Sequence, residues 1–319
     1  MLTCKSPRKV MLVAYRLAKT SLPTYSSEFS RHDFTLAQLF ACLVLREHQK
    51  KSYRGVEALL EDSSQWRQDI GLVRTPDHNT LWNAFNRLIK PRTIDSMLDQ
   101  TAEWAKQRKL LTGPFKPLSL DSSMFESRHV SRHFEKRQRQ SARDGRRKPR
   151  KTGEKQAGDR QRSRVVRSLP KLSLAVASSC HLILAARATT GAGADQRFFE
   201  PLLFDAWRRG DVKVAVADAG YDSEGNHCIA RQDMGVRSII PPNSGRPTDK
   251  LPAGRHRRNM HHRFKRKADK KYYGQRWQSE TVNSMIKRNL GSALRAKSAR
   301  RRSKELLLRV ITHNVMILQ

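Results

Sequence analysis

The chain has 319 residues, with 64 Lys and Arg against 29 Asp and Glu, which gives a formal net charge of +35. A chain of this charge repels itself when compact and is tolerated best beside a polyanion, of which nucleic acid is the commonest. A membrane surface is the alternative, but no run of about 18 apolar residues is present to span a bilayer. Residues 1–13 lack the apolar core and cleavage site of a signal peptide. Ribosomal and chromatin-packaging proteins share such a charge, so composition indicates nucleic acid without indicating an enzyme.

The four cysteines, Cys4, Cys42, Cys180 and Cys228, lie far apart and form no C-x-x-C pair. This spacing indicates a reducing compartment and argues against both a disulfide framework and a cysteine zinc site. We therefore expect a cytoplasmic protein.

The first hundred residues predict helices. Leu36, Leu39, Leu43 and Val44 share one helical face, with Asp33 as the expected N-cap. Residues 77–80 can cap a helix that ends before Pro91, and another helix is expected over about 93–109. We predict an all-helical N-terminal domain over residues 1–115, with its boundary near Gly113-Pro114.

From residue 116 the hydrophobic period changes to that of strands. Short strands are predicted at 117–121, 171–177, 182–188, 212–218 and 237–240, the second and third forming a hairpin. Helices are predicted at about 195–209, 223–234, 271–289 and 303–318. This element order is that of a ribonuclease-H-like α/β fold, so residues 116–319 are predicted to form one such domain.

Residues 127–168 fit neither pattern. They contain 16 Lys and Arg and 4 Asp and Glu, a balance of +12, with almost no apolar residues. Such a segment cannot bury enough surface to offset its ordering entropy. We predict a disordered basic insertion that contacts nucleic acid; a merely solubilising loop is the alternative.

Asp121 and Asp218 each follow a strand-like apolar run. If the two strands are neighbours, both carboxylates meet at one edge of the sheet, where open α/β sheets place their sites. Hard divalent ions prefer such oxygen ligands, and two ions can stabilise the attacking and leaving oxygens of a phosphodiester. The alternative is that each aspartate merely caps a turn.

A polar face is predicted in the last third of the chain. Tyr273, Arg276, Glu280 and Lys287 are separated by 3, 4 and 7 residues. At about 100° per residue they fall within roughly 60° of one helical face. The opposite side gathers apolar residues, namely Val282, Met285, Ile286 and Leu290. This face presents a carboxylate among cations, although solvated helix faces also carry Glu and Lys.

The spacing Y-x2-R-x3-E-x6-K resembles the C-terminal signature of DDE-type insertion-sequence transposases of bacteria and archaea. Residues 218–222, Asp-Ala-Gly-Tyr-Asp, look like the D-x-G-Y-D stretch around their second catalytic aspartate. Residues 120–123 resemble the surroundings of the first, and residues 75–80 resemble the upstream helical region. The resemblance covers about residues 30–319.

This resemblance implies a DNA transposase in which Asp121, Asp218 and Glu280 bind two Mg²⁺ ions, with Mn²⁺ able to substitute. Water would cleave the phosphodiester at each element end, and the freed 3′-hydroxyls would then attack target DNA. Tyr273, Arg276 and Lys287 would hold the DNA backbone. The resemblance further implies double-stranded DNA partners, a homodimer on DNA, association with the nucleoid, and DNA-end binding or dimerisation by the N-terminal domain.

Other interpretations carry less weight. Zinc at His129 and His133, or at His261-His262, lacks the usual companion ligands. Tyr273 could be the nucleophile of a tyrosine recombinase. That chemistry needs no metal, whereas the arrangement of carboxylates indicates a metal-dependent reaction. The basic run 257–267 could be a nuclear signal, but we expect it to bind phosphate. A non-catalytic DNA-binding protein derived from a transposase is the alternative function.

Overall fold

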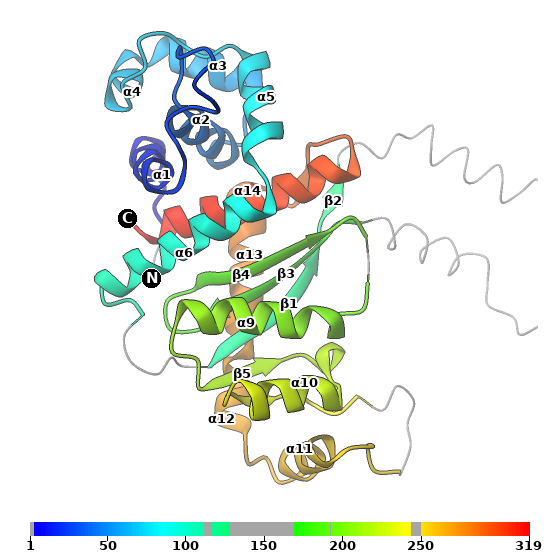
Figure 1. Cartoon of the computed structure of the whole chain (residues 1–319). Helices are drawn as coiled ribbons and strands as arrows, with labels where there is room; N and C mark the ends of the chain where they lie inside the picture. The colour runs from blue at the N-terminus through cyan, green and yellow to red at the C-terminus, as the bar shows by residue number, and fades with distance from the viewer. Residues whose placement is uncertain (1–2, 112–116, 128–168, 192, 244–249) are drawn as a thin grey trace, which may run out of the picture.

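The computed structural model describes residues 3–111, 117–127, 169–191, 193–243 and 250–319. Within these ranges, helices fill the N-terminal part, and a five-stranded sheet flanked by helices follows (Figure 1). None of the described helices is long and apolar enough to cross a membrane.

All elements found in residues 3–111 are helices. They are α1 (Pro7–Ser21), α2 (Leu36–His48), α3 (Tyr53–Asp62), α4 (Ser64–Asp69), α5 (His78–Leu88) and α6 (Pro91–Gln107). Asp77 caps α5 as predicted, accepting hydrogen bonds from the backbone of Asn79 and Thr80 at 2.8 and 3.1 Å.

The predicted N-cap of α2 was wrong. Thr35 caps this helix in a reciprocal capping box with Gln38, the two bonds measuring 2.8 and 3.2 Å. Asp33 instead pairs with Arg74 at 2.6 Å. The capping box satisfies the backbone N–H groups of Thr35 and Gln38 at once. The Asp33 carboxylate, two residues before Thr35, does not do this.

The central sheet is mixed, with strand order β4-β3-β1-β5-β6. Its strands are β1 (Leu118–Met124), β3 (Lys171–Ala177), β4 (Leu182–Thr189), β5 (Val214–Ala217) and β6 (Arg237–Ile239). β1, β3 and β4 pair antiparallel, whereas β1, β5 and β6 pair parallel. The predicted hairpin is confirmed as β3 and β4. This mixed sheet is consistent with the ribonuclease-H-like expectation.

β1 continues past the aspartate that was expected to end it. Ser122, Ser123 and Met124 remain paired with β3, so Asp121 lies inside the strand. β2 (Glu126–Ser127) then pairs with β7 (Ala293–Leu294). Residues 128–168 of the predicted insertion, and its disorder, lie outside the described residues.

Helices cover both faces of the sheet (Figure 1). On one face, α9 (Phe199–Arg209), preceded by the 3₁₀ turn η1 (Gln196–Phe198), packs on Leu118 and Leu120 of β1. On the other, α13 (Trp277–Leu290) packs its apolar stripe on Leu172 and Leu174 of β3. Because side chains alternate along a strand, Ser119, Asp121 and Ser123 face α13.

The remaining elements complete the β5–β6 side and the C-terminus. They are η2 (Ala219–Tyr221), α10 (Glu224–Cys228), the π-helix η3 (Ile229–Asp233), α11 (Arg255–Lys265), α12 (Lys270–Tyr273), the 3₁₀ turn η4 (Gly274–Arg276) and α14 (Ala299–Ile317). The expected continuous helix over 271–289 is therefore broken into α12, η4 and α13.

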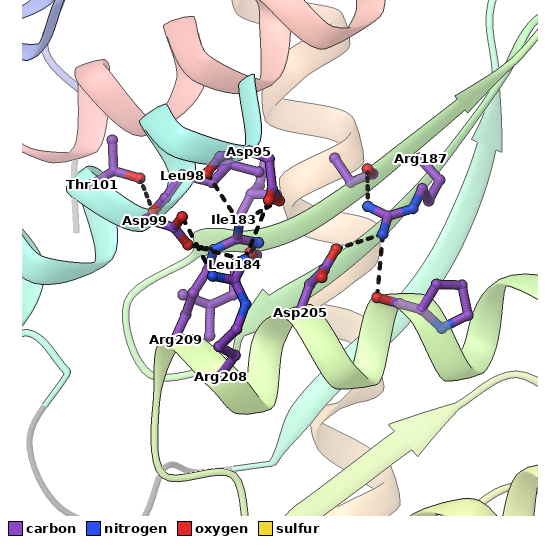
Figure 2. A network of polar contacts seen from close by, with 12 residues as sticks. Asp95, Leu98, Asp99, Thr101, Ile183, Leu184, Arg187, Asp205, Arg208 and Arg209 are labelled. Carbon is purple, nitrogen blue, oxygen red and sulfur yellow. Dashed lines mark hydrogen bonds and ion pairs between the residues drawn. The ribbon is translucent and has the colours of Figure 1, made fainter. Parts of the chain in front are cut away.

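An ionic network joins the helical segment to the sheet (Figure 2). Arg209 of α9 is buried and donates to Asp99 of α6 at 2.8 Å and to the Leu184 carbonyl of β4 at 2.7 Å. Arg209 also pairs with Asp95 of α6, and Arg208 reaches the same carboxylate at 3.2 Å. These contacts fix α6 against α9 and β4.

A second network, the Glu47 cluster, comprises Arg46, Glu47, Arg295, Glu305 and Arg309. Glu47 of α2 pairs with Arg46 at 2.5 Å, Arg295 at 3.2 Å and Arg309 of α14 at 3.4 Å. Arg309 also pairs with Glu305 at 2.8 Å. One hydrophobic cluster likewise runs from α1 and α2 through α14 to β3. The predicted domain boundary at residue 115 lies outside the described residues.

Candidate active site

The pairing of β1 with β5 brings the two predicted aspartates together. The parallel register matches Ser119 with Val216 and Leu120 with Ala217. One residue further, Asp121 comes opposite Asp218, which follows β5 directly. Neighbouring strands lie about 4.8 Å apart, and paired residues point to the same face. Asp121 faces α13, whereas the Asp218 carboxylate accepts a hydrogen bond at 2.7 Å from the backbone of Ala219 and so caps η2.

Asp121 is partly buried and is held from α13. The Asn283 side-chain amide donates a hydrogen bond to Asp121 Oδ2 at 3.1 Å. Burial raises the pKa of Asp121, and the nearby Glu280 charge adds to this rise. The Ser122 backbone, Arg276 and Asn283 oppose it without cancelling it. This carboxylate therefore lacks a full complement of positive charge.

Glu280 is on the first turn of α13, and 52% of its side chain is exposed. Arg276 of η4 donates to Glu280 Oε1, so the two residues form an ion pair. The pKa of Arg276 is raised although burial lowers it, because the charges of Glu280 and Asp121 both stabilise the guanidinium.

Tyr273 is at the end of α12, before the 3₁₀ turn. The predicted continuous helical face for the four signature residues was therefore wrong. Burial raises the pKa of Tyr273, and Asp218 and Arg276 both act on its hydroxyl electrostatically. The tyrosine thus still approaches the carboxylates, although η4 rather than α-helical spacing places it.

Lys287 of α13 is held against β1. Its Nζ donates to Ser123 Oγ of β1 at 2.7 Å and lies 5.1 Å from the centre of the Phe125 ring. The lysine therefore has a fixed position beside Asp121, two strand residues away.

Asp121, Glu280 and Lys287 line an open groove with a volume of about 530 Å³, whereas Asp218, Tyr273 and Arg276 do not line it. Its walls are formed by β1, α13 and the residues that follow α13. The lining residues are Asp121, Ser123, Glu280, Asn283, Ser284, Lys287, Arg288 and Ser292. Sequence reasoning missed Asn283 and Ser123 as site residues. The only signal for Asn283 was its position one turn after Glu280 on the same helix.

The donor set suits a hard divalent cation, because it offers carboxylate and amide oxygens without thiol or imidazole. The raised pKa of Asp121 fits this, since a cation would compensate its buried charge. Among the described residues, the one trio of acidic, His or Cys ligand atoms within 4.8 Å of one another is Glu224, Cys228 and His256. The three predicted carboxylates are therefore spread more widely than one ion would need.

The second aspartate of the D-x-G-Y-D stretch has a different role from the first. Asp222 accepts hydrogen bonds from the Asn243 backbone at 2.7 Å and from Arg257 of α11 at 2.9 Å. Glu224 accepts from the backbone of His256 and Arg257 at 2.9 and 3.0 Å. Both carboxylates attach the start of α11 to the site region.

The mixed sheet with helices on both faces is consistent with a ribonuclease-H-like domain. The family model of the transposase DDE domain matches residues 114–315. The chain therefore belongs to this transposase family. No curated protein matches the sequence.

Proposed function

We propose that this transposase cleaves DNA at the ends of an insertion sequence and joins the freed 3′-hydroxyls to target DNA. The observation that best supports this proposal is the parallel β1–β5 pairing, which ends at Leu120 and Ala217, one residue before Asp121 and Asp218. Family membership supports a transposase and double-stranded DNA as its partner.

Asp121, Asp218 and Glu280 would hold two Mg²⁺ ions, or Mn²⁺ in their place. When bound, such ions stabilise charge on the attacking and leaving oxygens of a phosphodiester. Asn283 orients the Asp121 carboxylate through the amide bond described above. Arg276 would hold the Glu280 side chain through their ion pair.

Tyr273, Arg276 and Lys287 would contact the DNA backbone. Lys287 is anchored on Ser123 with its ammonium group beside the groove, so a phosphate there would meet a pre-positioned cation. Tyr273 offers its hydroxyl from α12. Phosphate contacts of this kind set the position of DNA without reading its sequence.

We also propose roles for the rest of the chain. Residues 1–115 would form a helical domain for DNA-end binding or dimerisation, and residues 116–319 the catalytic domain. The chain would act as a homodimer on DNA, associated with the nucleoid, because two element ends must be handled together. The basic segment 127–168 would add sequence-independent phosphate contacts, and its deletion should flatten the salt dependence of DNA affinity.

The decisive experiment is cleavage of labelled duplexes that carry the ends of the DNA element encoding the chain. Replacing Asp121, Asp218 or Glu280 by Ala should slow cleavage by on the order of 10³-fold or more, because the ions contribute several kcal/mol. DNA-end binding should stay within a few-fold of wild type. Normal cleavage by one variant would remove that residue from the site.

Two further outcomes concern the whole mechanism. Equal cleavage in excess EDTA would exclude the metal-dependent reaction. End binding without any cleavage by the wild-type chain would favour a non-catalytic DNA-binding derivative.

A further inference from the structure

A second hollow lies on the far side of the sheet edge, between β6, η3 and α11. Its volume is about 430 Å³, and its lining includes four arginines and two histidines, namely Arg231, Arg237, Arg263, Arg266, His256 and His262. Among the described residues, none of those that line it is acidic. In Figure 1 α11 lies at the end of the molecule opposite α3 and α5. We call the hollow between β6, η3 and α11 the arginine hollow.

Arg231 forms the floor on the β6 side. Its guanidinium donates to Ser238 of β6, to Oγ at 3.1 Å and to the carbonyl at 2.6 Å. Among the described residues no carboxylate pairs with it. Burial lowers the pKa of Arg231, and the charges of Arg237 and Arg263 lower it further. Arg231 is thus a half-buried cation close to other cations. Its environment therefore favours the binding of an anion.

Asp269 explains how the arginines stay close together. It is 2% exposed and binds Arg263 through two bonds, of 2.6 and 2.7 Å, and Arg237 through another. The Asp269 carboxylate thus holds the guanidinium groups of Arg237 and Arg263 in place. Four arginines against one aspartate still leave a local balance of +3. The cations are positioned in advance but not neutralised.

His262 of α11 and Arg266, which directly follows this helix, also line the hollow. Both are exposed, and within the described part of the chain Arg266 has no side-chain partner. Asn259, Arg263 and Arg266 recur at intervals of four and three residues, so one face of α11 points into the hollow. Lys265 is the immediate neighbour of Arg266 but does not line the hollow.

The hollow is connected to the signature residues. Phe264 of α11 packs edge to face on Tyr273, with ring centres 5.0 Å apart. The Arg237 guanidinium lies 5.4 Å from the centre of the Tyr272 ring. α12, which carries both tyrosines, therefore bridges the hollow and the region of Asp218 and Arg276.

We propose that the arginine hollow is an anion site that binds a backbone phosphate of DNA extending past α12 from the active-site groove. This inference rests on the proposed function for its ligand. Guanidinium groups match phosphate oxygens in geometry and charge. A phosphate contact here, remote from the scissile bond, would fix the direction in which the duplex leaves the groove.

The test compares Arg266→Ala with the matched control Lys265→Ala. Affinity for labelled duplexes of several sequences is measured by fluorescence anisotropy across a NaCl series. Each phosphate contact contributes about 0.9 to the slope of log affinity against log salt. Arg266→Ala should lower the slope by about that amount for every sequence, and Lys265→Ala by less than half of it. Circular dichroism should show both variants folded.

Three results would overturn the proposal. Equal slopes for Arg266→Ala and wild type would remove the DNA contact, and equal losses in the two variants would reduce it to general surface charge. If inorganic phosphate raises the melting temperature of wild type but not of Arg266→Ala while DNA slopes stay equal, the ligand is a free anion. Because the readout is binding, failure of cleavage would affect only the proposed function.

Discussion

The active-site groove and the Glu47 cluster both collect carboxylates and arginines, yet they differ in charge balance. In the Glu47 cluster, burial alone would raise the pKa of Glu47, but Arg46, Arg295 and Arg309 together lower it. In the groove, burial raises the pKa of Asp121, and its partners do not reverse the rise. Positive charge in the first cluster thus outweighs the burial of Glu47, whereas the partners of Asp121 do not outweigh its burial.

The largest expected effect on stability comes from the Glu47 cluster. Glu47→Gln should lower the free energy of unfolding by about 3–5 kcal/mol, because it leaves buried arginines without their shared anion. Denaturant unfolding would measure this. The control is Asp33→Asn, which breaks an exposed pair with Arg74 and should cost about 0–1 kcal/mol. Equal small losses in both variants would erase the distinction between the clusters.

Asn283 should affect catalysis and leave the fold intact. Asn283→Ala removes the hydrogen bond that orients Asp121, and groups that orient metal ligands typically contribute 10–100-fold to activity or affinity. We expect cleavage to fall by about that factor and the Mg²⁺ concentration for half-maximal cleavage to rise. End binding should change little.

Ser284→Ala is the matched control for Asn283, since Ser284 is the next residue and lines the same groove. A drop in melting temperature without any change in Mg²⁺ dependence would make Asn283 a purely structural residue.

The pH dependence of stability should have opposite signs in the two regions. The raised pKa of Asp121 means that the folded state binds its proton more tightly than the unfolded state. Ionised Asp121 therefore destabilises the fold above that pKa, and Asp121→Asn should raise the melting temperature at pH 7 without divalent metal. The gain should vanish below about pH 4, where the carboxyl is protonated in both states.

For Glu47 the pKa is lowered, so its stabilisation is present at neutral pH and is lost as the pH falls through the folded-state value. The deficit of Glu47→Gln should therefore shrink in acid. The comparison would be contradicted if the melting temperatures of Asp121→Asn and Glu47→Gln, each relative to wild type, changed with pH in the same direction from pH 3 to 7.

The smallest effect is expected at Lys287. Lys287→Ala should reduce the salt slope of end binding by about 0.9 if it contacts one phosphate. It should also cost about 0.5–1.5 kcal/mol of stability through its lost bond to Ser123. Ser284→Lys, which adds a cation nearby, should not weaken binding. Lost stability with an unchanged slope would show that this lysine only braces the fold.

The strands were predictable because their hydrophobic runs are short and bounded, and β3 and β4 were recognised as a hairpin. The break before α13 was not predictable from periodicity. Gly274 has low helix propensity, and the Gln275 carbonyl accepts from Ser119 Oγ of β1 at 3.1 Å. A tertiary contact thus favours a 3₁₀ turn where the sequence pattern permits a helix.

α11 was missed as a helix for a related reason. Met260 is the one buried residue along it, so no apolar stripe exists to detect. Its position depends on Asp222, Glu224 and Asp269, which are distant in sequence. Asp121 and Glu280, which line the groove, were singled out from the sequence, but the amide contact of Asn283 required the fold.

The pairing at the end of β1 has a consequence for how this chain tolerates added length. Met124 pairs with Lys171, and the Phe125 amide donates to the Pro170 carbonyl at 2.9 Å. The chain thus leaves and re-enters the sheet at almost the same place, with its loop ends already closed by strand pairing. Each doubling of a flexible loop between such ends costs only about 0.6 kcal/mol of closure entropy. A reporter domain inserted there should therefore leave the pairing of β1 with β3 and β5 intact.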